Sequence, residues 1–158
     1  MNNNIKEEVR KRIKNKIDIS DLIEKEDISN EDLSGAVITK LIRRDSNISG
    51  CNFSNCTIGS DNSIIEIIRT NMSNCNFSGC KFIGTTWMRS CNAHNCNFKN
   101  ADVHKVSYEH TDFSGSTFCE SVITIGTRQG IGCIFPQSLF DDLTKNWNFK
   151  VSIQPKDK

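Results

Sequence analysis

Residues 51–56 read CNFSNC, residues 75–80 read CNFSGC and residues 91–96 read CNAHNC. Each stretch holds a small residue, then Asn, then an apolar residue, and the small residue returns five positions later. Self-similarity at a fixed short period is typical of repeat architectures, in which each unit packs against its neighbours. The chain is therefore predicted to be a series of five-residue units.

A large apolar residue forms the centre of each unit, and the centres stay in frame over most of the chain. Two small insertions interrupt them, one at Asp61–Ile64 and one extra residue near Arg89–Ser90. Arg43 stands at a centre although it is charged. The nineteen centres are Ile28, Leu33, Ile38, Arg43, Ile48, Phe53, Ile58, Ile67, Met72, Phe77, Phe82, Trp87, Ala93, Phe98, Val103, Tyr108, Phe113, Phe118 and Ile123.

A period of five fits neither regular secondary structure. It turns about 500° around an α-helix, so the centres form no apolar stripe. In a flat strand, alternate centres would lie on opposite faces. A chain that bends after every five residues can point all centres inward, and its stacked turns can pair like a parallel sheet at about 4.8 Å spacing.

The two positions before each centre also follow a rule. The position directly before it is usually Asn or Asp, whose side chains hydrogen-bond local backbone at bends. The position two before it is usually small, which suits a narrow interior. These small residues are Ala36, Ser46, Cys51, Cys56, Thr70, Cys75, Cys80, Thr85, Cys91, Cys96, Ala101, Thr111, Ser116 and Ser121.

This pattern resembles the A(D/N)LXX signature of pentapeptide-repeat proteins over roughly residues 26–125. The resemblance is best at residues 51–55, 96–100, 101–105 and 111–115. It implies an all-β fold, a right-handed parallel β-helix with four five-residue faces per coil. The chain departs from the signature by its two insertions and by Cys, Ser or Thr where the family often has Ala.

Four faces per coil mean that every fourth centre should stack in one column. One column becomes an interior stack of Leu33, Phe53, Phe77, Phe98 and Phe118. Its small positions include Cys51, Cys75 and Cys96, while Cys56 and Cys80 fall in a second column. We expect about five coils, a shaft of roughly 24 Å and two ladders of cysteines.

The remaining column is irregular, because it holds Arg43, Ile67, Trp87, Tyr108 and, if the frame persists, Arg128, and because both insertions border it. Irregular segments on a rigid scaffold often carry function. The candidate partner-contact face is therefore Ile67, Trp87, Met88 and Tyr108. The alternative, which stays open here, is that larger residues repack a distorted part of the core.

Both ends of a solenoid need caps. Residues 1–25 are predicted to be a helical N-terminal cap, with Ile5, Val9, Ile13 and Ile17 on one helix face. Residues 26–125 would be the β-helix. Residues 126–158 would be a C-terminal cap, with a short helix after Pro136 and then an amphipathic strand that folds back or joins a second chain as a homodimer. The apolar residues of that strand are Trp147, Phe149, Val151 and Ile153.

Composition argues against several classes of function. The 20 basic and 19 acidic residues leave a formal net charge of +1, so no overall field attracts nucleic acid or an anionic membrane. The sequence has no apolar stretch of membrane-spanning length and no signal peptide, so we expect a cytoplasmic protein with reduced thiols. Neither catalytic, cofactor-binding nor metal-binding residues are predicted. Cys119 and Cys133 lie outside the small positions and are expected to be the more reactive thiols.

The predicted function is a non-enzymatic protein-binding or scaffold module whose partner the sequence does not name. The resemblance implies an alternative, since some pentapeptide-repeat proteins mimic duplex DNA and modulate a type II topoisomerase such as DNA gyrase. A DNA mimic should carry a dense negative surface. Residues 28–125 hold nine acidic and eight basic residues, so the scaffold ranks first.

Overall fold

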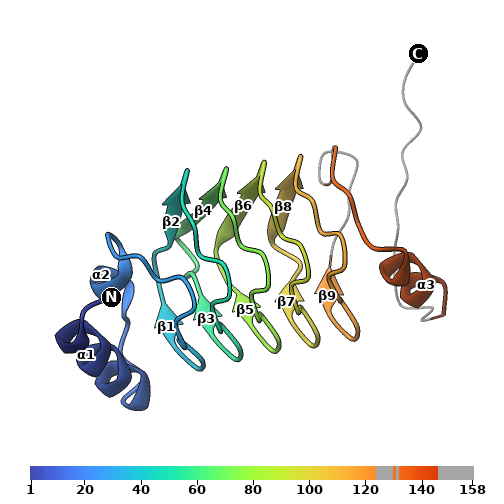
Figure 1. Ribbon diagram of the computed structural model, residues 1–158. Coiled ribbons are helices and arrows are strands. Elements are labelled where there is room, and N and C mark those ends of the chain that lie inside the picture. Colours follow the sequence, from blue (N-terminus) through green and yellow to red (C-terminus); the bar gives the residue numbers. More distant parts are fainter. Residues whose placement is uncertain (124–129, 131, 146–158) are drawn as a thin grey trace.

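The five-residue units wind into a right-handed parallel β-helix, in which each bend stops a strand before it grows long (Figure 1). The computed structural model describes residues 1–123, 130 and 132–145. Two sheets run along the shaft, and in both of them all strands are parallel. The first sheet stacks β1 (Val37–Ile38), β3 (Thr57–Ile58), β5 (Lys81–Phe82), β7 (Asp102–Val103) and β9 (Val122–Ile123).

The second sheet has longer strands and includes the predicted irregular column. It stacks β2 (Ile42–Arg44), β4 (Ile64–Ile68), β6 (Thr85–Arg89) and β8 (Val106–Glu109). The two other faces pair through single bridges. One ladder joins Asp32, Asn52, Asn76, Asn97 and Thr117, and the other joins Asn47, Asn71, Asn92, Asp112 and Ile134. These four faces confirm the predicted quadrilateral coil, and four turns connect the five strands from β1 to β9.

Asparagine has two separate roles in the bends. In the ladder positions its side chain accepts a hydrogen bond from the amide two residues later, as Asn52 Oδ1 does from Ser54 N at 3.1 Å. At the corners it adopts a left-handed backbone, with φ of 56° at Asn55 and 55° at Asn95. Asn tolerates this conformation better than most residues that have a Cβ. The frequency of Asn in the sequence thus follows from the geometry of the bends.

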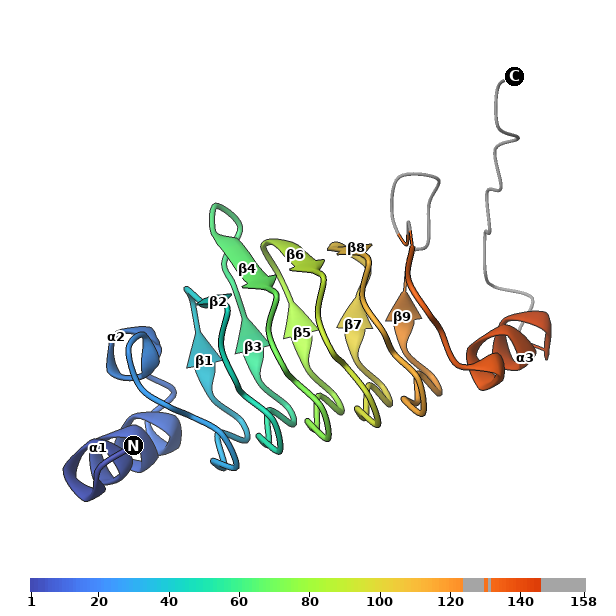
Figure 2. The same ribbon diagram turned by 45° about the horizontal axis from the view of Figure 1, so that its top comes forward.

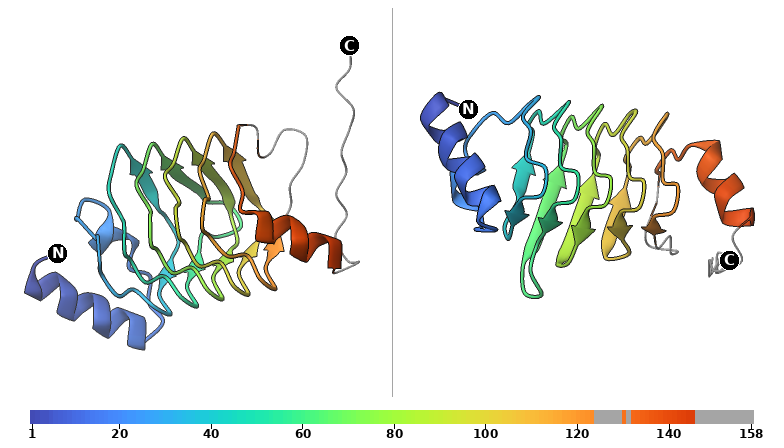
Figure 3. Two further views of the ribbon diagram at one scale, coloured as in Figure 1. Left: turned by 45° about the vertical axis from the view of Figure 1, so that its right-hand side comes forward. Right: turned by 90° about the horizontal axis from the view of Figure 1, so that it is seen from below.

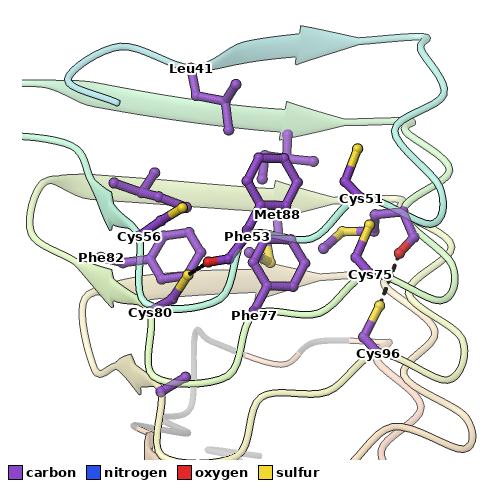
Figure 4. Close-up of a cluster of buried hydrophobic side chains, with 14 of the residues drawn as sticks. Leu41, Cys51, Phe53, Cys56, Cys75, Phe77, Cys80, Phe82, Met88 and Cys96 are labelled. Atoms are coloured by element: carbon purple, nitrogen blue, oxygen red, sulfur yellow. Dashed lines mark hydrogen bonds between the residues drawn. The ribbon is translucent and has the colours of Figure 1, made fainter. Parts of the chain in front are cut away.

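The predicted interior stack is confirmed. The rings of Phe53, Phe77 and Phe98 lie nearly parallel, with centroids 5.1 Å apart at both steps, and Phe118 continues the stack at 4.8 Å from Phe98. Leu33 ends the column and is fully buried. Figure 4 shows Phe53 and Phe77 one above the other, between the thiols of the two cysteine ladders. Each such side chain stabilises the fold by about 1.5 to 3 kcal/mol through burial alone.

The N-terminal cap consists of α1 (Asn3–Lys14) and α2 (Ser20–Ile23), which lie at the blue end of the shaft (Figure 1). Val9 of α1 is buried, and Ile5 and Ile13 pack against the core. The prediction that Ile17 continues this stripe was wrong. The helix ends at Lys14, Lys16 takes a left-handed φ of 57° that turns the chain away, and Ile17 is 51% exposed.

At the other end, α3 (Gln137–Lys145) begins directly after Pro136, as predicted. Leu139 is buried, whereas Phe140 is 44% exposed. The ring of Phe135 stacks on Phe113 at 5.1 Å and so covers the last described coil. The predicted strand residues Trp147, Phe149, Val151 and Ile153 lie outside the described residues, as does Arg128. No helix in the described part of the chain is long and apolar enough to cross a bilayer.

Candidate protein-binding face

Strand β6 corrects the predicted register of the irregular column. Thr86 and Met88 point inward and Trp87 points outward, so Trp87 is not a centre. Met88 aligns with Ile67 in β4 and with Tyr108 in β8. Because Phe82 and Met88 are six residues apart, the extra residue lies before β6, around Gly84. The predicted position near Arg89–Ser90 was wrong.

Three of the four residues predicted to contact a partner lie in the core. Ile67, Met88 and Tyr108 are fully buried, and the Tyr108 hydroxyl donates a hydrogen bond to the Val103 carbonyl at 3.4 Å. Their assignment to a surface was wrong, because strand alternation turns them inward. The column of Ile67, Met88 and Tyr108 is therefore part of the core, in line with the alternative that larger residues repack it. Trp87 alone remains at the surface, where it is half-buried.

The outward side of this sheet is an exposed surface that we call the Trp87 face. Its apolar members include Ile42, which is 40% exposed, and Ile64, which is 51% exposed. Figures 2 and 3 show that the arrows of this sheet lie side by side along the shaft, with the loop before β4 projecting at one end. The residues of the face are Ile42, Arg44, Ile64, Glu66, Ile68, Thr85, Trp87, Arg89, Ser107 and Glu109.

The charges of the Trp87 face are paired across neighbouring strands. Arg44 contacts Glu66, and Arg89 Nε lies 3.0 Å from a carboxylate oxygen of Glu109. The Arg89 guanidinium also lies over the Trp87 ring, 4.9 Å from its centroid. The face therefore combines an aromatic anchor, three isoleucine side chains and neutralised charges. The alternation of buried and outward residues in β4 and β6 reveals the face, and the sequences IIEII at 64–68 and TTWMR at 85–89 do not show it.

Comparison with known families decides the identity of the repeat. Residues 70–107 match, in eight copies, the family model described as Pentapeptide repeats. This stretch of the chain consists of pentapeptide repeats. Among curated proteins, none matches the sequence significantly.

Solved structures of pentapeptide-repeat type are similar to this chain only at low identity. A trypsin-treated form of QnrB1, a plasmid-mediated fluoroquinolone resistance protein, is 14% identical, with a TM-score of 0.33 and coverage of 86% of this chain and 87% of that chain. HetL, a pentapeptide repeat protein involved in heterocyst differentiation regulation from the cyanobacterium Nostoc sp. strain PCC 7120, is 16% identical. Its TM-score is 0.32, with coverage of 76% of this chain and 68% of HetL.

The cysteines of the pentapeptide repeats act as hydrogen-bond donors between coils. Cys80 Sγ donates to the Phe53 carbonyl at 2.6 Å and Cys96 Sγ to the Met72 carbonyl at 2.9 Å (Figure 4). Ser116 and Thr111 do the same with their hydroxyls, toward Ala93 and Met88. In each case the acceptor belongs to the preceding coil. This bond explains why Cys, Ser or Thr replaces Ala in so many units.

Burial also sets the chemistry of these thiols. It raises the pKa of Cys96 to about 12, and it raises the pKa values of Cys80 and Cys91 as well. Since the thiolate is the reactive form, Cys80, Cys91 and Cys96 are protected both by their protonation and by their burial. Cys51 and Cys56 are protected by their burial. Cys119 and Cys133 are half-buried and stand outside the ladders.

Alkylation of the native protein should therefore separate two classes of thiol. With iodoacetamide near pH 8, we expect rapid modification of Cys119 and slower modification of Cys133, whose pKa is raised by burial. The six buried thiols should react only after unfolding, which peptide mass spectrometry would show. Early alkylation of Cys96 in the native protein would contradict the proposed protection.

The histidines do not form a joint site. His94 Nε2 lies 2.8 Å from Asp112 Oδ2 on the adjacent coil, and His104 contacts Asp102 two residues before it. Hydrogen bonds from Ser114 and His94 hold the pKa of the Asp112 carboxyl at about 2, so this group is ionised at neutral pH. Nowhere in residues 1–123, 130 and 132–145 do three His, Cys, Asp or Glu side chains gather as metal ligands.

Proposed function

We propose that this pentapeptide-repeat protein is a binding module that holds a partner protein against the Trp87 face. The observation that carries the proposal is an outward Trp on a rigid sheet whose same face also bears the exposed side chains of Ile42 and Ile64. Aromatic residues are enriched in the centres of protein interfaces, where they contribute much of the binding energy. The paired charges around Trp87 suit the rim of such an interface.

Affinity capture from the native cell extract tests this proposal. A Trp87→Ala variant should lose at least tenfold of the captured partner, because truncation of an aromatic hot spot weakens binding by about 2 kcal/mol or more. Val122→Ala is a matched control, since Val122 is also an exposed apolar residue but lies on the other sheet. It should retain capture. Both variants should keep the melting temperature of the parent, and equal capture by all three proteins would contradict the proposal.

The surface gives less support to the alternative of a DNA mimic acting on a type II topoisomerase. One outward ladder presents Asp32, Asn52, Asn76, Asn97 and Thr117, of which only the first is charged. The Trp87 face neutralises its carboxylates with arginines. A DNA supercoiling assay separates the two functions, and inhibition of gyrase that survives Trp87→Ala would favour the alternative.

A further inference from the structure

The first strand of the Trp87 sheet has an open edge. In β2, the Arg43 amide and carbonyl face β4, as the bonds from Glu66 N to Leu41 O at 2.9 Å and from Asp45 N to Ile68 O at 3.0 Å show. Successive residues of a strand direct their backbone groups to opposite edges. The amides and carbonyls of Ile42 and Arg44 therefore point away from β4. Throughout residues 1–123, no backbone hydrogen bond to these four groups is found.

A groove lies beside this edge. It has a volume of about 260 Å³ and separates β2 from α2. Figure 1 shows β2 as the first arrow of its sheet, with no strand beyond it toward the N-terminal helices. Leu41 and Ile23 contribute apolar atoms to the groove, and Lys40 pairs with Glu24 across it at 2.8 Å.

Arg43 adds an unused donor at the same place. Arg43 is 6% exposed, and its guanidinium donates to the carbonyls of Ile23 and Glu26, but its Nε has no acceptor. It is the one buried side-chain N or O in the described part of the chain that lacks a partner. A buried donor without an acceptor destabilises the protein, and an added acceptor would remove that cost.

We propose that an extended peptide segment of a partner protein adds to the open edge of β2 as a further strand. The inference rests on the proposed protein-binding function and assigns it a second contact. Strand addition satisfies the four free backbone groups of Ile42 and Arg44. In the added strand, an apolar side chain would lie beside Ile42 on the outward side. The next residue would lie over Arg43, where a small side chain with an oxygen acceptor, such as Thr or Ser, could meet Nε.

A synthetic peptide that copies residues 84–90, GTTWMRS, is a suitable probe. This stretch forms β6 in the same sheet, and when it runs antiparallel to β2 it can place Trp beside Ile42 and the preceding Thr over Arg43. The fluorescein-labelled peptide should bind the full-length protein in a fluorescence anisotropy titration. Saturable binding is the expected result, and its absence at millimolar protein would overturn the proposal.

Variants of Ile42 test whether the backbone edge is responsible. Ile42→Pro removes an amide that points to solvent and leaves the β2–β4 bonds intact, and proline is tolerated on such edges. It should weaken peptide binding at least tenfold. Ile42→Thr keeps the amide and should remain within about threefold of the parent, because it alters only one side-chain contact. Equal binding by the proline variant would contradict strand addition.

Methylated peptides supply a test that does not depend on how the variants fold. One peptide carries N-methyl groups at the positions of Thr86 and Met88, and the other at the positions of Trp87 and Arg89. Because a strand bonds its neighbour through alternate residues, only one of the two should lose binding to the parent protein. Loss by both peptides, or by neither, would overturn the proposal.

Two further controls separate this inference from other outcomes. Trp87→Ala should bind the peptide normally, so a failure of the Trp87 face and a failure of the edge are distinguishable. Self-association of the parent protein that Ile42→Pro abolishes would show that a second copy occupies the edge, and this would replace the proposed partner segment.

Discussion

Replacing Phe77 by Ala should lower the free energy of unfolding by about 3 to 5 kcal/mol, which is the usual cost of truncating a buried Phe. Phe77 has the largest expected effect because it lies in the middle of the stack, 5.1 Å from both Phe53 and Phe98. The cavity would be enclosed by coils on both sides, whose hydrogen-bonded spacing prevents them from closing on it. Urea denaturation followed by circular dichroism would measure the change.

Phe140→Ala provides a control with the same chemistry. Phe140 is 44% exposed on α3, so its truncation leaves no enclosed cavity and should change the free energy of unfolding by about 0.5 kcal/mol or less. If Phe77→Ala were no more harmful than Phe140→Ala, the interior stack would not be the main source of stability.

Replacing Gly84 by Ala should destabilise the protein by about 1 to 3 kcal/mol, the range for overpacking a close contact. Gly84 needs no unusual backbone conformation. A Cβ there would instead lie 2.6 Å from the Ser63 carbonyl oxygen and 2.8 Å from the Ser60 carbonyl oxygen. Both obstacles are backbone atoms of the loop inserted before β4, so this loop would have to move. Thermal unfolding and amide hydrogen exchange of residues 60–63 would report the change.

Gly35→Ala is a control that separates the clash at position 84 from the general free-energy cost of replacing a glycine. Gly35 has a left-handed φ of 72°, yet the atom that an added Cβ would approach most closely is the flexible Lys16 Nζ, at 3.6 Å. The substitution should cost about 1 to 2 kcal/mol from backbone strain and leave exchange in residues 60–63 unchanged. Faster exchange in that loop caused by Gly35→Ala would contradict the local explanation.

The fold could be predicted because a five-residue period is incompatible with other regular structures, and the column of Phe53, Phe77 and Phe98 followed from counting. The register at Trp87 could not be obtained in this way. Trp87 and Met88 are adjacent and both apolar, so hydrophobicity does not show which one points inward. The pairing of Met88 with Ile67 and Tyr108 decides it, and that pairing depends on contacts between coils.

The candidate site was therefore only partly predictable. Trp87 was identified, but for the wrong reason, because it was taken as an irregular centre. Ile42 and Ile64 were not identified as surface residues, since their exposure depends on which residue of each strand faces the core. The predicted association strand from Trp147 to Ile153 remains a prediction beyond the described residues.

The hydrogen bonds from the small interior positions point mostly toward the N-terminal end of the shaft. Most of these thiols and hydroxyls donate to a carbonyl of the preceding coil, as Cys51 does to Ile28 and Cys75 to Ile48, whereas Ser121 donates within its own coil, to Phe118. Ala36 occupies the same position in the first coil, and its side chain has no donor. The two ends are thus not interchangeable. A unit duplicated after the last coil would carry its own thiol or hydroxyl, which could donate to the exposed carbonyls of that coil. A unit placed before the first coil would need a hydrogen-bond donor at position 36, and Ala36 has none.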